Sequence, residues 1–497
     1  MARKATLGVQ FRTPNLQTLL TVAVGILALS LRLCGLEDQS MTMDEVTELT
    51  LARRSVPDIV GAQDGFPPLY HLLLKGWLAT LGPETARWFS VLCGMMLIVV
   101  VWQIGRIVGG STTAWAAAIL TAISPINVWY AQEARSNALF YLCALLSVWF
   151  FARAMLENRG RDWAWYGVSA IVGLYTHYYF TLVIASLLVT VPLFSDPRSR
   201  MGALVRVHAI IALAAVPWMW LLVPDLKLQS GYAAPHVGLD LKSLGYTLVT
   251  FLFGFSVGPS VRELHIARTG NTLLGALPWG VAALTVCLLL FRPLWGAPQS
   301  RHWALRLGLV IALPVAACGI AAAVMDLGFR VRYVAWGASL LLVLLSAALV
   351  HGRRSAATLV AGAILVGLSA VSLINRQWNA RYSNEDSRGA ATYLAVSLPS
   401  SSPVFVTSGY MAGTVEYYLD DDWRLRRLPN LPAAGPPTTG LDVIRAYVPA
   451  GARFWLIYTR PWDGDPGGRL RDELRTHAGL RLIADWPGVE LYEGQGW

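Results

Sequence analysis

The sequence has few charged residues. Asp, Glu, Lys and Arg make up 14% of the 497 residues, whereas 55% are hydrophobic. A typical soluble domain has about 25% charged residues. The chain has too little polar surface for an ordinary soluble protein of this length, and the same composition excludes a disordered, collagen-like or coiled-coil protein.

Cysteines and common catalytic motifs are also scarce. Each of the five cysteines lies in an apolar run without a second Cys or a His at metal-ligand spacing, so we interpret them as small core residues. No Walker loop, HExxH or GxSxG motif occurs, and ATP hydrolysis is therefore unsupported. No small-residue cleavage site follows the first apolar run, which we interpret as a retained membrane anchor.

Long apolar runs are abundant. A membrane-spanning helix needs about 20 such residues. The sequence predicts eleven spans, at residues 16–36, 86–106, 112–131, 135–156, 162–177, 179–195, 204–224, 271–292, 303–325, 331–350 and 355–375. The run 67–82 is ambiguous, because it is short and contains His71 and Lys75. It could cross the membrane or lie flat at the interface.

The arginines favour the flat placement of 67–82. If the N-terminus is cytoplasmic and this run does not cross, every cytoplasmic turn is basic, as the positive-inside rule requires. These turns contain Arg106, Arg153, Arg159, Arg161, Arg198, Arg200, Arg206, Arg292, Arg301, Arg306, Arg353 and Arg354. If 67–82 crossed instead, most of these arginines would lie outside. We therefore expect a cytoplasmic N-terminus and an external C-terminus.

The last part of the chain differs in kind from the rest. In residues 376–497 the charge content rises. Strand-length apolar runs at 404–408, 453–459, 480–486 and 489–493 alternate with helical stretches such as 385–397 and 468–477. This pattern predicts a C-terminal extracytoplasmic α/β domain. The expected fold class is a polytopic α-helical membrane protein in which a domain at 1–375 carries outer loops at 37–85 and 225–270.

Two clusters in the first outer loop contain residues that could take part in catalysis or binding. Asp44 and Glu45 are adjacent carboxylates that could accept a proton from a hydroxyl or hold a divalent cation. The alternative is a helix N-terminus capped by Thr42 or Asp44. Tyr70 and His71 follow two prolines that fix the backbone where the loop returns to the membrane, or that simply begin a helix.

Further polar clusters stand at the predicted outer ends of spans. Gln132, Glu133 and Arg135 lie between two apolar runs, where burial costs several kcal/mol unless they are paired or hydrated. The alternative is an interfacial turn with a Glu133–Arg135 pair. His177 stands at another junction, where a capped interfacial histidine is the alternative to a ligand.

Arg330, Arg332 and Tyr333 stand at the mouth of a later span. Arginine matches phosphate oxygens bidentately, although both arginines could instead reach lipid headgroups. Weaker individual signals come from the cations of the loop 225–270, which are His236, Arg262, His265 and Arg268.

The order of these motifs resembles a known superfamily. The segments are MTMDEVTEL, GFPPLYHLLL, ETARWFSVLCG and SPINVWYAQEARSNALFYL, with looser similarity in RYVAW and in the segment 385–405. They resemble the GT-C polytopic glycosyltransferases that use polyprenyl-phosphate sugars. The similar branch contains protein O-mannosyltransferases, the lipid A aminoarabinose transferase and rhizobial lipopolysaccharide transferases. The resemblance is best over residues 10–200.

The resemblance implies a site. It implies that Asp44 and Glu45 form the catalytic centre and that the Gln132–Arg135 segment lines the active cavity. It also implies a re-entrant element, but Phe66 stands where a His or Glu metal ligand sometimes occurs. A divalent cation, held by Asp44 and Glu45 if anywhere, therefore stays an open alternative. The flat placement of 67–82 agrees with juxtamembrane helices of this fold.

These observations predict a glycosyltransferase of the bacterial plasma membrane that acts on its outer side in cell-envelope modification. A polyprenyl-monophosphate sugar would be the donor, and a hydroxyl of a glycan, lipid or protein would attack with inversion; no nucleic acid is involved. Asp44 would be the base, and Glu45 would position the acceptor or a cation. The arginines that would hold the lipid phosphate are Arg135, Arg330 and Arg332. The predicted substrate-binding residues are Tyr70, His71, Gln132, Glu133, Arg135, His177, Arg262, His265, Arg330, Arg332 and Tyr333.

Two rivals differ in class. A lipid-linked sugar flippase or transporter would have charges in mid-span or paired broken helices. In this sequence the charges gather at one predicted face, where the α/β domain also lies, which favours interfacial catalysis. The other rival is a polymerase or ligase that uses lipid-pyrophosphate donors, and the Asp44-Glu45 loop argues against it.

Overall fold

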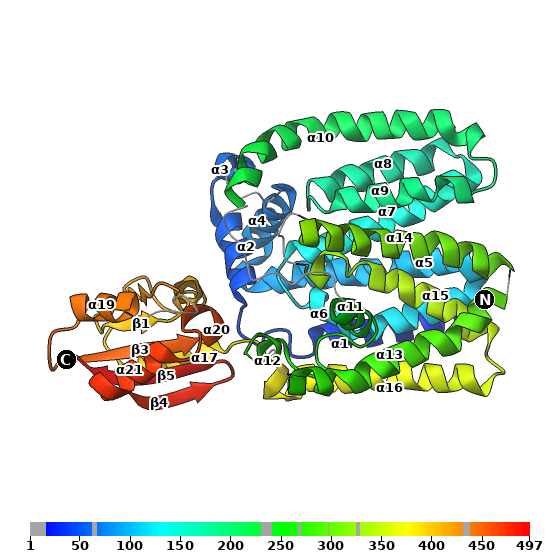
Figure 1. Ribbon diagram of the computed structural model, residues 1–497. Helices are drawn as coiled ribbons and strands as arrows, with labels where there is room; N and C mark the ends of the chain where they lie inside the picture. Colours follow the sequence, from blue (N-terminus) through cyan, green and yellow to red (C-terminus); the bar gives the residue numbers. More distant parts are fainter. Residues whose placement is uncertain are drawn as a thin grey trace, which may run out of the picture.

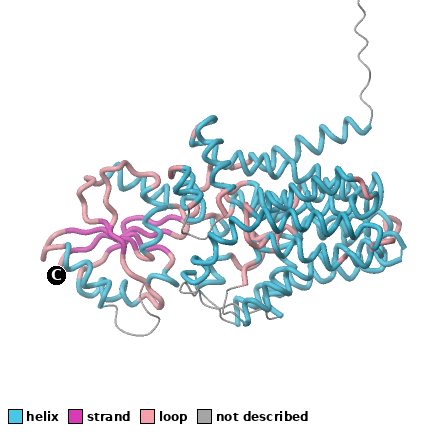
Figure 2. Tube along the Cα trace, turned by 90° about the horizontal axis from the view of Figure 1, so that it is seen from above, coloured by secondary structure: helices cyan, strands magenta, loops and turns pink. Residues whose placement is uncertain are grey.

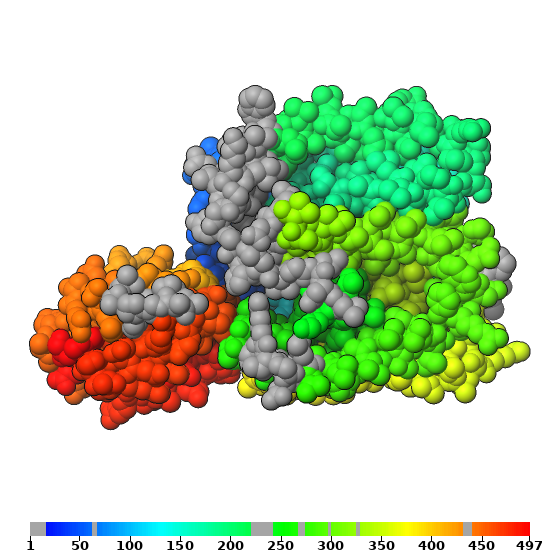
Figure 3. All heavy atoms as spheres, in the orientation of Figure 1, coloured from blue at the N-terminus to red at the C-terminus, as the bar shows by residue number. Residues whose placement is uncertain are grey.

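The computed structural model describes residues 16–61, 67–229, 241–266, 270–296, 298–324, 329–430 and 438–497. Long helices run side by side in a bundle, and a smaller part that contains all strands of the described chain lies at one end of it (Figures 1 and 2). In the space-filling view this C-terminal part projects from the end of the bundle as a separate lobe (Figure 3).

The bundle is built from helices of very different length. They are α1 (Leu16–Leu33), α5 (Ala86–Ala122), α6 (Pro125–Ala131), α7 (Ser136–Glu157), α8 (Gly160–Leu174), α9 (Phe180–Val189), α10 (Met201–Gln229), α11 (Leu241–Phe253), α12 (Val261–Ile266), α13 (Gly270–Gly296), α14 (Pro298–Val324), α15 (Gly337–His351) and α16 (Ala356–Trp378). Helix α7 is buried on all sides, as expected of an apolar helix at the centre of a membrane bundle.

Each of the eleven predicted spans contains a helix. Within the described residues, seven helices are long and apolar enough to cross a membrane, and the stretches 180–193 and 337–351 are shorter apolar helices. The lower count has two causes. Helices α8, α9 and α15 are short, with 15, 10 and 15 residues, and α5 holds more than one predicted span. The long α5 holds the span 86–106 and the start of 112–131, and its backbone breaks at Gly109 and Gly110. Gly110 has a φ of 78°, which a residue with a side chain rarely adopts.

One predicted boundary is wrong. The span 331–350 was expected to begin at Val331, but α15 begins at Gly337. Residues Val331–Tyr333 form a 3-10 turn, η4, instead. Hydrophobicity alone does not separate this turn from the helix, because Val331, Val334 and Ala335 are apolar and buried in either case.

Short helices cover one end of the bundle. They are α2 (Met43–Arg53), α3 (Val56–Val60), α4 (Leu69–Leu81) and the 3-10 turn η1 (Pro83–Thr85). Figure 1 shows α2 running across the direction of the long helices. Helix α4 has 13 residues, too few to cross a bilayer, and it packs against α2. The structure therefore agrees with the flat placement of 67–82.

The C-terminal lobe contains a five-stranded mixed sheet. Its strands are β1 (Val404–Val406), β2 (Arg426–Arg427), β3 (Arg453–Thr459), β4 (Arg481–Trp486) and β5 (Val489–Gln495). The strand order is β2-β1-β3-β5-β4; β1 is parallel to β2 and β3, and β5 is antiparallel to β3 and β4. The helices are α17 (Ser387–Ser397), α18 (Ala412–Glu416), α19 (Thr438–Tyr447), α20 (Pro461–Gly464) and α21 (Arg469–His477). The sequence predicted every strand except the two-residue β2.

The lobe is joined to the first outer segment by hydrogen bonds. The Ser40 hydroxyl donates to Asp386 at 2.7 Å, and the Met41 N–H donates to the Tyr418 hydroxyl at 2.7 Å. An Arg381–Glu263 ion pair at 2.7 Å adds a contact through α12. The lobe therefore docks directly beside the segment that leads into α2.

Candidate active site

The first turn of α2 places two carboxylates at the outer end of the bundle. Thr42 caps the helix, since its hydroxyl accepts from the Glu45 N–H at 3.3 Å while Glu45 Oε2 accepts from the Thr42 N–H at 2.9 Å. This reciprocal capping box fixes where the helix begins. The predicted alternative of a Thr42-capped helix is thus present, and it holds Asp44 in place.

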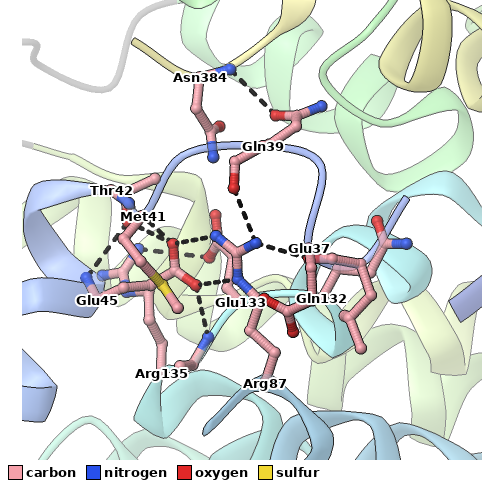
Figure 4. A network of polar contacts seen from close by, with 12 residues as sticks. Glu37, Gln39, Met41, Thr42, Glu45, Arg87, Gln132, Glu133, Arg135 and Asn384 are labelled. Atoms are coloured by element: carbon pink, nitrogen blue, oxygen red, sulfur yellow. Dashed lines mark hydrogen bonds and ion pairs between the residues drawn. The ribbon is translucent and has the colours of Figure 1, made fainter. Parts of the chain in front are cut away.

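Glu45 is completely buried and fully paired. Its carboxylate accepts from Arg87 Nε at 2.8 Å and Nη2 at 3.1 Å, and from the Ala134 N–H at 2.9 Å (Figure 4). Burial alone would raise the pKa of Glu45, but the charge and hydrogen bonds of Arg87 with the backbone donors lower it. Glu45 is therefore an ionised structural anchor whose oxygens are already occupied.

Sequence reasoning missed Arg87. Its guanidinium also donates to the carbonyls of Leu36 at 2.6 Å, Gln39 at 3.0 Å and Ser40 at 3.3 Å. One side chain thus ties the segment after α1 and the start of α2 to α5. The available signal was a lone arginine in the first turn of an otherwise apolar run.

Asp44 lies on the open side of the same turn. Its side chain is 49% exposed, and Oδ2 is 2.9 Å from both Arg135 Nη2 and Arg332 Nη1. Loss of water around Asp44 would raise its pKa, but Arg135 and Arg332, followed by Arg460 and Arg330, lower it. The structure therefore gathers Asp44 with three predicted arginines, of which Arg330 is exposed and acts through its charge.

Glu133 backs the Arg135 side chain. The two form the predicted pair at 3.6 Å, and Glu133 Oε1 accepts from Trp129 Nε1 at 2.7 Å. Its Oε2 is buried without a hydrogen bond from the described part of the chain. Burial raises the pKa of Glu133 although Arg135 lowers it. Arg376 lies 3.5 Å over the Trp129 ring and was not predicted.

Gln132 has a structural role. Its Nε2 donates to the carbonyls of Cys34 at 2.8 Å and Arg32 at 3.2 Å, and Oε1 accepts from Arg376 at 3.4 Å. These bonds join the end of α1 to the end of α16 beneath the site.

Aromatic rings flank the arginines. Tyr333 stacks on Tyr179 with ring centres 4.1 Å apart, and Arg332 lies over Tyr333 at 5.4 Å. His177 stacks on Phe140 and accepts from the Tyr179 N–H at 3.2 Å. His177 is buried, and together with Phe140, Tyr179 and Tyr333 it forms an aromatic cluster beside the arginines.

Four predicted residues contact other parts of the chain. Tyr70 is completely buried, and His71 is buried against Glu48. Arg262 donates to the Ala380 carbonyl at 2.7 Å, and His265 stacks on Trp462, so both belong to the docking of the lobe. Phe66, His236 and Arg268 lie outside the described residues.

The donor set does not fit a cation shared by Asp44 and Glu45. The oxygens of Glu45 are taken by Arg87, Thr42 and Ala134, and Asp44 faces two guanidinium groups. Within the described ranges, no three His, Cys, Asp or Glu side chains gather in a way that could hold a metal ion.

Comparisons with known proteins bear on the family and the fold. The family "Dolichyl-phosphate-mannose-protein mannosyltransferase" matches residues 67–221, which is less than half of the chain. No curated protein matches the sequence. Among solved structures, apo ArnT from Cupriavidus metallidurans is similar with a TM-score of 0.61 and 13% identity over 96% of this chain and 98% of that one.

A second similar structure is the archaeal oligosaccharyltransferase AglB from Archaeoglobus fulgidus. It has a TM-score of 0.55 and 14% identity over 95% of this chain and 73% of that chain. The chain therefore has the GT-C glycosyltransferase fold, a multi-pass membrane fold, and the superfamily resemblance found in the sequence is confirmed.

Proposed function

We propose that the protein transfers a sugar from a polyprenyl-monophosphate donor to a hydroxyl of a glycan, lipid or protein acceptor, with inversion at the anomeric carbon. The observation that carries the proposal is Asp44, a half-exposed carboxylate 2.9 Å from both Arg135 and Arg332 at the end of the bundle. A carboxylate can accept a proton, and arginines bind phosphate.

Two of the comparisons support the choice of donor. The AglB structure is a complex with an inhibitory peptide and a dolichol-phosphate. The description of the matching family names dolichyl-phosphate-mannose, which is a lipid-monophosphate sugar. Both favour a lipid monophosphate as the donor of this chain.

The ion pairs suggest what the donor does on binding. Arg135 and Arg332 are held by Asp44, which keeps the carboxylate neutralised. A lipid phosphate accepts from guanidinium groups in the same geometry. We expect the phosphate to take both arginines, so that Asp44 loses its neutralising partners and becomes a stronger base.

The transfer step then needs one base. The acceptor oxygen forms a bond to the anomeric carbon as its proton passes to Asp44. The bond from that carbon to the phosphate oxygen breaks, and its electron pair stays on the phosphate. Arg135 and Arg332 stabilise the charge that develops there. Phosphate is a good leaving group, so no separate acid is required, and a single displacement inverts the configuration.

The remaining acids support this step. Glu45 acts as a positioning residue, because its pair with Arg87 sets the first turn of α2. Glu133 holds Arg135 from behind through an ion pair at 3.6 Å. The side of the membrane is also part of the proposal: the arginine-rich turns face the bacterial cytoplasm, so Asp44 and the C-terminal lobe lie outside.

Binding of undecaprenyl phosphate to the detergent-purified protein tests the phosphate site. The lipid should raise the thermal midpoint of the unsubstituted protein. Loss of a hydrogen bond to a charged group should make Arg332→Ala bind about tenfold more weakly or worse. Arg354→Ala, in the exposed turn between α15 and α16, is the matched control and should bind normally. Equal affinity in both variants would remove Arg332 from the phosphate site.

A further inference from the structure

The carboxyl ends of β1 and β3 lie at the same edge of the sheet of the lobe. Strands β1 and β3 are neighbours and parallel, with Val404 opposite Trp455 and Val406 opposite Ile457. After β1 the chain goes to β2 on one side, whereas after β3 it goes to β4 beyond β5 on the other. In open α/β sheets, ligands bind outside the carboxyl ends of strands at such a reversal.

Strained backbone marks the same edge. Ser408, just after β1, has a φ of 49°, and Arg460, just after β3, has a φ of 43°. Left-handed conformations at residues other than glycine are strained and concentrate at functional sites. The Ser408 hydroxyl donates to the Arg460 carbonyl at 2.9 Å, so the two residues support each other.

The side chains at this edge are polar and partly open. Arg460, 25% exposed, donates to Glu385 at 2.9 Å from Nε and 3.3 Å from Nη2, and it lies 5.7 Å over the ring of Tyr410. The exposed Tyr410 donates its hydroxyl to Asp463 at 2.5 Å. Burial would raise the pKa of Glu385, but Arg460 lowers it, so the pair is ionic.

This edge faces the candidate active site. Asp386, next to Glu385, accepts from Ser40, four residues before Asp44. Figure 1 shows α20, which begins directly after Arg460, at the end of the lobe that meets the bundle. The effect of the Arg460 charge on Asp44 agrees with this orientation.

We propose that Tyr410, Arg460 and Glu385 form a saccharide-binding subsite that holds the acceptor, or the glycan attached to it, beside Asp44. The Arg460–Glu385 pair offers N–H donors and carboxylate acceptors at fixed positions to neighbouring sugar hydroxyls. The exposed ring of Tyr410 adds an apolar face. The subsite rests on the proposed function, since it supplies the acceptor side of that reaction.

Binding of methyl glycosides to the full-length protein in detergent tests the subsite. The probes are the methyl glycosides of glucose, mannose, galactose and N-acetylglucosamine, and saturation-transfer NMR measures their dissociation constants. We expect at least one to bind and Arg460→Asn to weaken it about tenfold. Asparagine tolerates the left-handed conformation, so the backbone is retained. Glu385→Gln, which leaves that backbone unchanged, should also weaken binding.

The matched control is Arg453→Asn at the other end of β3. Arg453 is exposed and pairs with Glu493, so its loss should leave glycoside binding unchanged. Undecaprenyl phosphate should bind normally to Arg460→Asn. Equal glycoside affinity in the Arg460 and Arg453 variants, or no glycoside binding by the unsubstituted protein, would overturn the subsite. Normal lipid binding by Arg332→Ala would count against the donor site and leave the subsite standing.

Discussion

Asp44 and Glu45 are neighbours in the sequence, but their environments are opposite. Asp44 is half exposed between two arginines, whereas Glu45 is buried against a third. Successive residues of an α-helix point about 100° apart, so a capped first turn directs one carboxylate outward and the other inward. The pair therefore divides into a reacting residue and a structural one.

The first prediction concerns Glu45. Glu45→Gln leaves Arg87 buried without its counter-charge, and breaking a buried ion pair costs about 3–5 kcal/mol. We expect a clear fall in the thermal midpoint of the detergent-purified protein. Asp44→Asn should change the midpoint little, because Asp44 is open to solvent. Equal stability of the two variants would contradict the division.

The second prediction concerns pH. The arginines hold the pKa of Asp44 below its usual value, so Asp44 stays ionised, and able to accept a proton, down to lower pH than an ordinary aspartate. Activity should therefore be lost only as the pH falls through that lowered pKa. Arg332→Ala removes one of these charges and should move the acid limb of kcat/KM to higher pH.

The pH profile of transfer checks this shift, with Arg354→Ala as the control. An acid limb that stays in place in the Arg332 variant would show that another group titrates.

Single residues could be predicted only in part. The sequence selected Asp44 as one of two adjacent carboxylates in the first outer loop, and Arg135 and Arg332 because they stand at predicted span ends. In the structure each arginine lies 2.9 Å from Asp44. It could not predict Arg87 or Arg376, because their partners come from distant segments. Tyr70 and His71 looked similar to the others in sequence, but α4 turns them toward the core.

Among the elements, α2 matters most, because its cap sets the direction of Asp44. The third prediction is that Thr42→Ala lowers stability by about 1 kcal/mol and also reduces transfer. Ser55→Ala removes the cap of the neighbouring α3, which carries no proposed site residue, and should affect stability alone. Thermal unfolding measures the stability of both variants, and the transfer rate measures their activity. Normal transfer by a destabilised Thr42→Ala protein would show that the cap does not set the direction of Asp44.

The helices were more predictable than their ends. Continuous apolar runs identify membrane helices well, because the bilayer requires about 20 apolar residues. The turn η4 and the break at Gly109–Gly110 depend on local backbone conformation that hydropathy does not record. The parallel β1–β3 pair also depends on contacts between residues about 50 apart. The sequence therefore did not predict that Ser408 and Arg460, which follow these strands, lie together.

At the scale of the whole molecule, the sequence predicts how the bundle is oriented in the membrane. The fourth prediction is that a reporter fused after Trp378 is active outside the cytoplasm, and one fused after Arg200 inside. The arginine bias of the turns is the reason. A cytoplasmic reporter at Trp378 would mean that the number of crossings is wrong by an odd number.

The most direct test of the account is sugar transfer by Asp44→Asn. The assay uses purified protein, a polyprenyl-phosphate sugar and the matched acceptor, identified from the glycan or lipid that disappears when the gene is deleted. The substitution keeps the shape of the side chain and removes its basicity. We predict that the rate falls about 100- to 10,000-fold while folding is retained. Asp58→Asn, which changes an exposed acid of α3, is the control and should stay active. Near-normal transfer by well-folded Asp44→Asn would contradict the assignment of Asp44 as the base.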